Sequence, residues 1–163
     1  MTHALHRGEI EISTDPSRLD IDIIYGFLTR SYWAEQIPRA IVERSLANSI
    51  CFGAYRENAQ IGFARVISDE ATYAYLADVF VLEPFRGRGV GSLLMECITS
   101  HPELQGLRRW TLLTRDAHGL YRRFGFDEPR NPERFMEISN PDVYKTACSP
   151  DEEKKRSDPM TPE

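Results

Sequence analysis

The stretch PFRGRGVGSLL, residues 84–94, places three glycines and two arginines within six positions. It lies between the almost continuously apolar run TYAYLADVFVL (72–82) and an apolar stripe at helical spacing over residues 89–100. This pattern predicts a buried strand, a turn and a helix, in that order. The first amides of a helix have no intrahelical acceptor, and that helix end carries roughly half a positive charge. Glycines leave those amides uncovered and arginines add charged donors, so the turn predicts a phosphate site, most simply for a pyrophosphate.

Two common phosphate-binding loops do not match this turn. A Walker A loop needs lysine and then serine or threonine after its last glycine, whereas Gly91 is followed by Ser92 and Leu93. A GxGxxG dinucleotide pattern that begins at Gly87 has Ser92 in place of its third glycine. The sequence therefore argues against nucleotide hydrolysis and dinucleotide redox chemistry.

Periodicity around the turn predicts a mixed α/β (α+β) sheet. Strands are expected at 9–13, 49–55, 60–68, 72–82, 108–114 and 134–139. Helices are expected at 20–32, around 41–46 with an end near Asn48, at 89–100 and at 117–124, with Asp20 as a cap and Gly125 as a left-handed C-cap. Tight turns make the three middle strands antiparallel, and the last two helices are expected to be crossovers, so helices should cover both faces. The strand 72–82 is expected to be central and buried on both faces.

The length of 163 residues suits one domain, and 41% hydrophobic residues suffice for a real core. We expect an N-terminal extension over residues 1–8 and the domain over 9–142. Residues 143–163 are polar and are expected to form a disordered tail.

Composition argues against several classes of protein. No apolar run approaches the roughly 20 residues of a membrane span, and the first residues lack the apolar core of a signal peptide. The three scattered cysteines favour free thiols in a reduced, cytoplasmic compartment, and the four histidines form no cluster, so no metal site is expected. A net charge of −5 argues against a nucleic-acid partner. A homodimer is compatible with the sequence, which does not specify one.

Two motifs give the sequence a family resemblance. The turn fits R-x-x-G-x-G as RGRGVG over residues 86–91. The stretch DAHGLYRRFGF (116–126) fits A-x-x-L-Y-x-x-x-G-F. Together, and in the order of the predicted elements over about residues 9–139, they resemble the GNAT superfamily of acyl-CoA-dependent N-acetyltransferases. The resemblance implies a mostly antiparallel sheet with a splay between the central strand and the next one.

The resemblance also implies where acetyl-CoA, as cosubstrate, would bind. The pantetheine arm would run beside the central strand and hydrogen-bond to the backbone near Phe80, Val81 and Leu82. The residues implied for the pyrophosphate are Arg86, Gly87, Arg88, Gly89, Val90, Gly91 and Ser92. Family members often carry asparagine where Thr114 stands, and its hydroxyl would keep one such hydrogen bond to the pantetheine. Arg122 and Arg123 are either solvated surface residues or a further contact to the cofactor phosphates.

Catalytic roles are implied for two residues, each with a structural alternative. Tyr121, the tyrosine of the second motif, would give a proton to the departing thiolate, or it is a core tyrosine on the apolar face of a helix. Asp78 is the only carboxylate within the run 72–82. Because a buried charge needs a partner, Asp78 either makes structural hydrogen bonds or serves as a base or substrate-orienting group. Glu83 and Glu35 are fallback bases, and Asp116 is expected to cap the helix that follows it.

Acceptor binding is the least specified property. Tyr32 and Trp33 lie in a segment that lines the acceptor pocket in the family, although core packing would explain them equally well. The leading hypothesis is transfer of an acetyl group from acetyl-CoA to a primary amine of a small molecule or peptide. The alternative is a non-catalytic acyl-CoA-binding sensor or regulatory module, which would need the glycine turn but not Tyr121.

Overall fold

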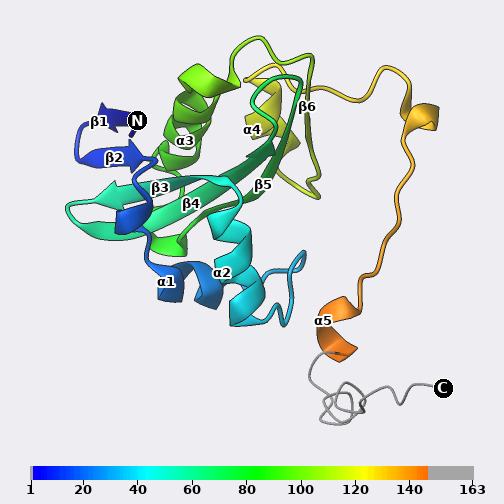
Figure 1. The fold of residues 1–163 in the computed structure, drawn as a ribbon. Helices are drawn as coiled ribbons and strands as arrows, with labels where there is room; N and C mark the ends of the chain where they lie inside the picture. Colours follow the sequence, from blue (N-terminus) through cyan, green and yellow to red (C-terminus); the bar gives the residue numbers. More distant parts are fainter. Residues whose placement is uncertain (1, 147–163) are drawn as a thin grey trace, which may run out of the picture.

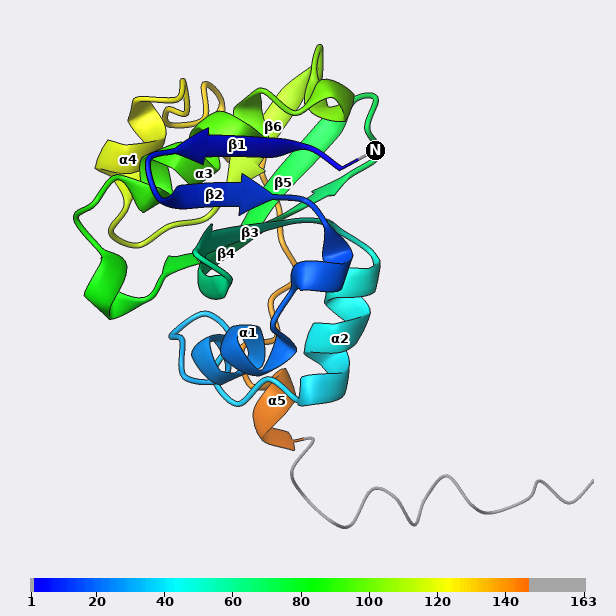
Figure 2. The same ribbon diagram turned by 90° about the vertical axis from the view of Figure 1, so that its left-hand side faces the viewer.

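The computed structural model of the protein describes residues 2–146, in which six strands form one sheet in the order β1-β2-β3-β4-β5-β6 (Figures 1 and 2). Neighbouring strands are antiparallel except β5 and β6, which are parallel. The strands are β1 (Ala4–Arg7), β2 (Ile10–Ser13), β3 (Ile50–Arg56), β4 (Ala59–Ser68), β5 (Tyr73–Val81) and β6 (Arg109–Leu112). The helices are α1 (Ile21–Leu28), α2 (Arg39–Ala47), α3 (Val90–Thr99), α4 (His118–Arg122) and α5 (Val143–Thr146). None of the helices in this described part is both long and apolar enough to cross a bilayer.

Helices cover both faces of the sheet, as the sequence predicts (Figure 1). On β3, Phe52 and Ala54 belong to the core under α3, whereas Cys51 belongs to the core under α1 and α2. This division follows from the alternation of side chains along a strand. Helix α3 contributes the apolar residues Val90, Leu93, Leu94, Met95, Cys97 and Ile98. Helices α1 and α2 contribute Ile24, Leu28 and Val42.

Two of the predicted helix boundary signals are confirmed. The Asp20 side chain accepts a hydrogen bond from the Ile23 amide at 3.1 Å and caps α1. Gly125 has a φ of +88° after α4, and the Phe126 amide donates to the Tyr121 carbonyl at 3.2 Å. That hydrogen bond closes the end of α4 in the way that a left-handed glycine permits.

Strand β5 separates from β6 halfway along its length. The parallel pairing runs only from Tyr73 opposite Arg109 to Leu76 opposite Leu112. Beyond these pairs β5 continues to Val81 and stays paired with β4, whereas β6 has ended. The predicted splay is therefore confirmed, and it leaves one edge of the second half of β5 open.

A β-bulge lies at the point where β5 separates from β6. Phe63 on β4 is opposite Phe80, but Arg65 is opposite Ala77, so β5 carries an extra residue in this step. Asp78 lies in the bulge with a φ of +54°. Positive φ is uncommon for a residue other than glycine, and aspartate is one of the few that tolerate it. A bulge bends its strand and re-aims a side chain, which here is the carboxylate of Asp78.

The N-terminal predictions need correction. The strand expected at 9–13 is β2, and its hairpin partner β1 lies within residues 1–8, which were expected to precede the domain. The periodicity of β1 is weak because it is a short edge strand whose residues are mostly exposed. The strand 72–82 is not central: β5 is next to the edge strand β6, and Tyr73 is exposed.

The C-terminal predictions also need correction. Residues 134–139 pair with no strand in the described part of the chain, so α4 is not a crossover. Alternation favours an extended backbone but supplies no partner. The predicted tail begins with α5, and its remainder, residues 147–163, lies outside the described residues.

A substitution at Gly62 would test how closely strands β4 and β5 approach each other. A methyl group on Gly62 would lie 2.9 Å from the Phe80 carbonyl oxygen and 3.3 Å from the Ala54 Cβ. The strands would have to move apart, so Gly62→Ala should lower the free energy of unfolding by about 1–3 kcal/mol. The control Gly26→Ala adds a methyl in α1, where nothing lies within 4 Å, and should raise that free energy by about 0.5–1 kcal/mol. Chemical denaturation measures both, and a Gly62→Ala variant as stable as the wild type would contradict the close approach.

Candidate functional site

The separation of β5 and β6 opens a groove of about 1290 Å³. Its walls are the second half of β5, the segment that follows β6, the loop between α1 and α2, and the start of α4. Among its lining residues are the predicted site residues Tyr32, Trp33, Asp78, Phe80, Leu82, Arg86, Thr114 and Tyr121. The fold thus gathers residues from the two motifs and from the α1–α2 loop around one cavity.

The glycine turn presents free amides at the start of α3. Gly87 and Gly89 have φ values of +74° and +80°, a region that favours glycine. The first helical hydrogen bond runs from the Leu93 amide to the Gly89 carbonyl at 3.0 Å. The amides of Val90, Gly91 and Ser92 precede it, and no side chain caps this helix end. These uncovered donors and the helix dipole fit an anionic group.

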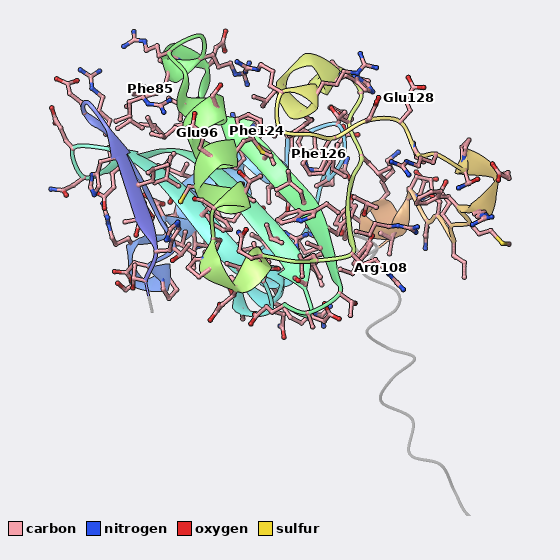
Figure 3. All side chains as sticks on the ribbon, turned by 90° about the horizontal axis from the view of Figure 1, so that it is seen from above. Phe85, Glu96, Arg108, Phe124, Phe126 and Glu128 are labelled. Atoms are coloured by element: carbon pink, nitrogen blue, oxygen red, sulfur yellow. The ribbon has the colours of Figure 1, made fainter. Side chains whose placement is uncertain are left out.

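Arginine side chains surround this helix end. Arg123, from the end of α4, donates through Nη2 to the Ser92 Oγ at 2.9 Å, and Arg88 is exposed within the turn. Arg86 donates through Nε to the Val81 carbonyl at 2.9 Å, which keeps its guanidinium beside the open edge of β5. Arg122 instead lies 3.5 Å from Glu128, so it does not share the position of Arg123. Figure 3 views α3 from above, with Phe85 labelled before the turn and Glu128 beyond α4.

Only part of the β5 backbone is free to hydrogen-bond to a ligand in the groove. The Val81 carbonyl faces the open edge, since it accepts from Arg86 rather than from a strand. Leu82 differs from the expectation, because its amide donates to the Ile61 carbonyl at 2.8 Å and its carbonyl accepts from the Phe85 amide at 2.9 Å. Leu82 therefore lines the groove with its side chain, and its backbone has no free hydrogen-bonding group.

Tyr121 lies at the bottom of the groove, on α4. It is buried, and burial raises the pKa of its hydroxyl to about 12, with a smaller contribution from Tyr32. The hydroxyl is therefore fully protonated at neutral pH, and it has no hydrogen-bond partner among residues 2–146. Thr114 supports the start of this helix, because its Oγ1 accepts from the Ala117 amide at 3.0 Å. The cap expected from Asp116 is not formed, because the N-cap position is Ala117, no side chain of residues 2–146 caps α4, and Asp116 is exposed.

Asp78 is tied on both carboxylate oxygens. Its Oδ2 accepts from Arg65 Nε at 2.5 Å, and its Oδ1 accepts from Trp33 Nε1 at 2.9 Å. Arg65 also donates to the Ser49 Oγ at 3.1 Å. The two charged side chains are 16% and 10% exposed, for Arg65 and Asp78 respectively, so they form a mostly buried pair. The carboxylate therefore links β4 to the α1–α2 loop, and it fixes the orientation of the Trp33 indole.

Tyr32 and Trp33 lie where the α1–α2 loop crosses the gap between β5 and β6. Trp33 is anchored at the β5 side by Asp78. Tyr32 is anchored beyond β6, where its hydroxyl accepts from the Arg115 amide at 3.3 Å and the Arg115 guanidinium lies 3.9 Å from its ring centroid. The two rings meet edge to face at 5.0 Å, and Phe27 packs beside Trp33 and stacks on Phe80. This loop therefore forms an aromatic strap over the groove.

Within residues 2–146, no cluster of histidine, cysteine or acidic side chains could hold a metal ion. The groove is lined by aromatic rings, by arginines, by the carboxylates of Asp78, Glu83 and Asp116, and by Tyr121.

Comparison with known proteins places this arrangement in a family. A model for the acetyltransferase (GNAT) domain matches residues 47–128. A Gibberella zeae protein named as a putative acetyltransferase is 33% identical in an alignment 138 residues long, which covers 71% of this chain and 77% of that protein. The chain belongs to the GNAT acetyltransferase family. A structure named as a GNAT-family acetyltransferase, from Xanthomonas campestris pv. campestris, matches with a TM-score of 0.82 and 49% identity over 85% of this chain and 99% of that chain. A Clostridium acetobutylicum structure with acetyl-CoA shares the fold, with a TM-score of 0.58 and 15% identity over 85% of this chain and 96% of that chain.

Two residues of the GNAT site were missed in the sequence analysis. Arg65 is the only charged residue of β4, and a tight turn joins β4 to β5, which holds Asp78. That combination was a usable signal for an ion pair across the hairpin. Arg115 had no comparable signal, because its partner Tyr32 is 83 residues away.

The Asp78 anchor predicts a measurable effect on Trp33. Asp78→Asn tolerates the positive φ but leaves Arg65 without its countercharge, so the free energy of unfolding should fall by about 3 kcal/mol. In a Trp110→Phe background, which leaves Trp33 as the only tryptophan, Asp78→Asn should also make the fluorescence easier to quench with acrylamide. The control Asp116→Asn changes an exposed carboxylate of the same groove and should alter neither value. Unchanged stability and quenching in Asp78→Asn would contradict the anchor.

Proposed function

We propose that this GNAT protein is an acetyl-CoA-dependent N-acetyltransferase that transfers the acetyl group to a primary amine of a small molecule or peptide by direct attack on the thioester. The observation that carries the proposal is that the free amides of the glycine turn lie at the end of the same open β5 edge that lines the groove. Acetyl-CoA would place its diphosphate at the glycine turn and its extended pantetheine along the open edge of β5. Family membership supports acetyl transfer, and the acetyl-CoA in the Clostridium acetobutylicum structure supports the choice of donor.

The diphosphate would be held by the amides of Val90, Gly91 and Ser92, with Arg88 and Arg123 as charged neighbours. The pantetheine would pair with β5 near Val81, whose carbonyl faces the open edge, whereas Phe80 is paired with Phe63 of β4 and would contribute its side chain. Thr114 would contribute less than an asparagine, since its hydroxyl oxygen already accepts from Ala117.

Tyr121 would act at the sulfur of the leaving group. In the reaction the amine nitrogen bonds to the carbonyl carbon, the carbon–sulfur bond breaks, the nitrogen loses one proton and the thiolate gains one. The pKa of Tyr121 is about 12, whereas that of an ordinary thiol is about 8.5, so full transfer of the phenolic proton to the thiolate is uphill. We therefore assign Tyr121 as a hydrogen-bond donor that stabilises the developing thiolate, rather than as the source of its proton.

The attacking amine must be neutral, which holds for only about one in 10³ molecules of a lysine-like amine at pH 7. Asp78 would be a positioning residue in this step, because both its oxygens are occupied. Glu83 and Asp116 are exposed carboxylates at the groove, so water or one of these two carboxylates would take the proton. The amine would bind under the strap, with Tyr32 and Trp33 against its body.

Acetyl-CoA binding tests the first half of the proposal. A Cβ at Gly91 would meet only the Leu120 Cδ2, at 3.6 Å, and an acidic residue in the first turn of a helix is stabilising. Gly91→Asp should therefore fold at least as stably as the wild type. It should still weaken acetyl-CoA by roughly tenfold or more, because it sets a negative charge beside the diphosphate. Isothermal titration calorimetry measures this, with Gly91→Ala as the uncharged control. Equal affinities in all three proteins, or no binding by the wild type, would refute the assigned site.

Tyr121→Phe tests catalysis separately from binding. Removing one hydrogen-bond donor to a developing anion costs about 10²–10³ in turnover. We expect that loss in an assay of free CoA thiol over a panel of primary amines, with the acetyl-CoA dissociation constant and the melting temperature unchanged. Full turnover in Tyr121→Phe would remove this residue from the mechanism. Tight acetyl-CoA binding by the wild type with no thiol release from any amine would instead favour the non-catalytic binding module.

A further inference from the structure

Two arginines line the groove beside the aromatic strap and keep hydrogen-bond donors free. Arg30 donates through Nε to the Gly26 carbonyl at 2.7 Å, and its two Nη atoms have no partner within residues 2–146. The Arg115 guanidinium lies over the Tyr32 ring, 3.9 Å from the centroid. A guanidinium that stacks on a ring uses its flat face, so the N–H groups around its edge stay available. Each side chain is therefore held by one contact and can still bind a ligand.

Four of the seven charged residues that line the groove add no net charge to the strap end. Arg65 and Asp78 form the mostly buried pair described above, so their charges cancel. Glu83 and Arg86 carry opposite charges and follow the end of β5, on the side of the glycine turn. The charge at the strap is thus set by the other three residues.

These three residues, Arg30, Arg115 and Asp116, set two positive charges against one negative charge. Arg115 Nη2 lies 4.0 Å from Asp116 Oδ2, and the two side chains are 66% and 71% exposed. An ion pair this long and this exposed is weak, so both groups remain available to a ligand. The strap end of the groove therefore offers donors for a carboxylate and one carboxylate for a cation. A small zwitterion has the complementary charges.

We propose that the acceptor is an amino acid or a closely similar small amine that carries a carboxylate, and that Arg30 and Arg115 determine this specificity. The inference rests on the proposed transfer to an amine and narrows the class of acceptor. The two guanidiniums would bind the carboxylate through charge-assisted hydrogen bonds, while Tyr32 and Trp33 contact the body of the molecule. A polyamine would instead bring further positive charge against the arginines, which disfavours it.

Matched pairs of acceptors test the role of the carboxylate. L-phenylalanine and 2-phenylethylamine differ only in the carboxylate, as do L-tyrosine and tyramine. In an assay of free CoA thiol, kcat/KM of the wild type should be roughly tenfold or more higher for the amino acid of each pair, because hydrogen bonds to a charged group are strong. Spermidine should be the poorest acceptor. Equal values within the pairs, or a preference for the amines or for spermidine, would overturn this inference and leave the proposed acetyl transfer intact.

Substitution of both arginines tests whether they cause the preference. In Arg30→Gln/Arg115→Gln, the ratio of kcat/KM within each pair should fall by roughly tenfold, with the acetyl-CoA dissociation constant unchanged. A purely structural disturbance of the strap would lower both values of a pair alike, and the different amine pKa values cancel when the ratios of wild type and variant are compared. The control Arg44→Gln changes an exposed arginine of α2 outside the groove and should keep the wild-type ratio. A ratio that survives the double substitution would overturn the assignment.

Binding of a carboxylate that cannot be acetylated separates this inference from the proposed function. Isothermal titration calorimetry should show that the wild type binds 3-phenylpropionate roughly tenfold more tightly than 3-phenylpropionamide, and that the double variant binds both equally. Loss of this difference in the wild type would overturn the carboxylate site, whether or not any amine is acetylated. The difference in binding without turnover of any amine would refute the proposed acetyl transfer alone.

Discussion

Strands β5 and β6 stop pairing after Leu76 and Leu112, and the site could not form without this separation. A sheet that stayed paired would have neither a groove nor an open backbone edge. Here β6 stops while β5 continues beside β4, and the bulge at Asp78 bends β5 at the same place. The loop after α1 then crosses the gap and is anchored on both sides of it. Groove, strap and free edge therefore follow from one break in strand pairing.

Electrostatics explains how an acidic chain builds a local site for an anion. The net charge is −5, yet the start of α3 is surrounded by backbone amides and by Arg86, Arg88 and Arg123. The one buried carboxylate among the described groove residues, Asp78, is compensated by Arg65 beside it. An internally neutral pair leaves the positive field of the helix end undiminished, and it holds Trp33 in place. The Asp78–Arg65 pair thus contributes to the stability of the fold, whereas the arginines near the start of α3 are placed to bind an anion.

Features that depend on neighbouring residues were predictable from the amino-acid sequence. The glycine turn, the Asp20 cap, the left-handed Gly125 and the order of strands and helices from β2 to α4 are set by local backbone preference and by periodicity. Both family motifs are local in the same sense, so the glycine turn and Tyr121 could be named without a structure.

Contacts between residues that are distant in the sequence could not be predicted in this way. Asp78 is 45 residues from Trp33, and nothing local distinguishes a carboxylate that will be tied on both oxygens from one that is free to act as a base. The strand expected at 134–139 failed for a related reason, since alternation sets the conformation of a strand but not the edge that receives it. Strand pairing and side-chain burial depend on neighbours in space, and those neighbours come from residues far away along the chain.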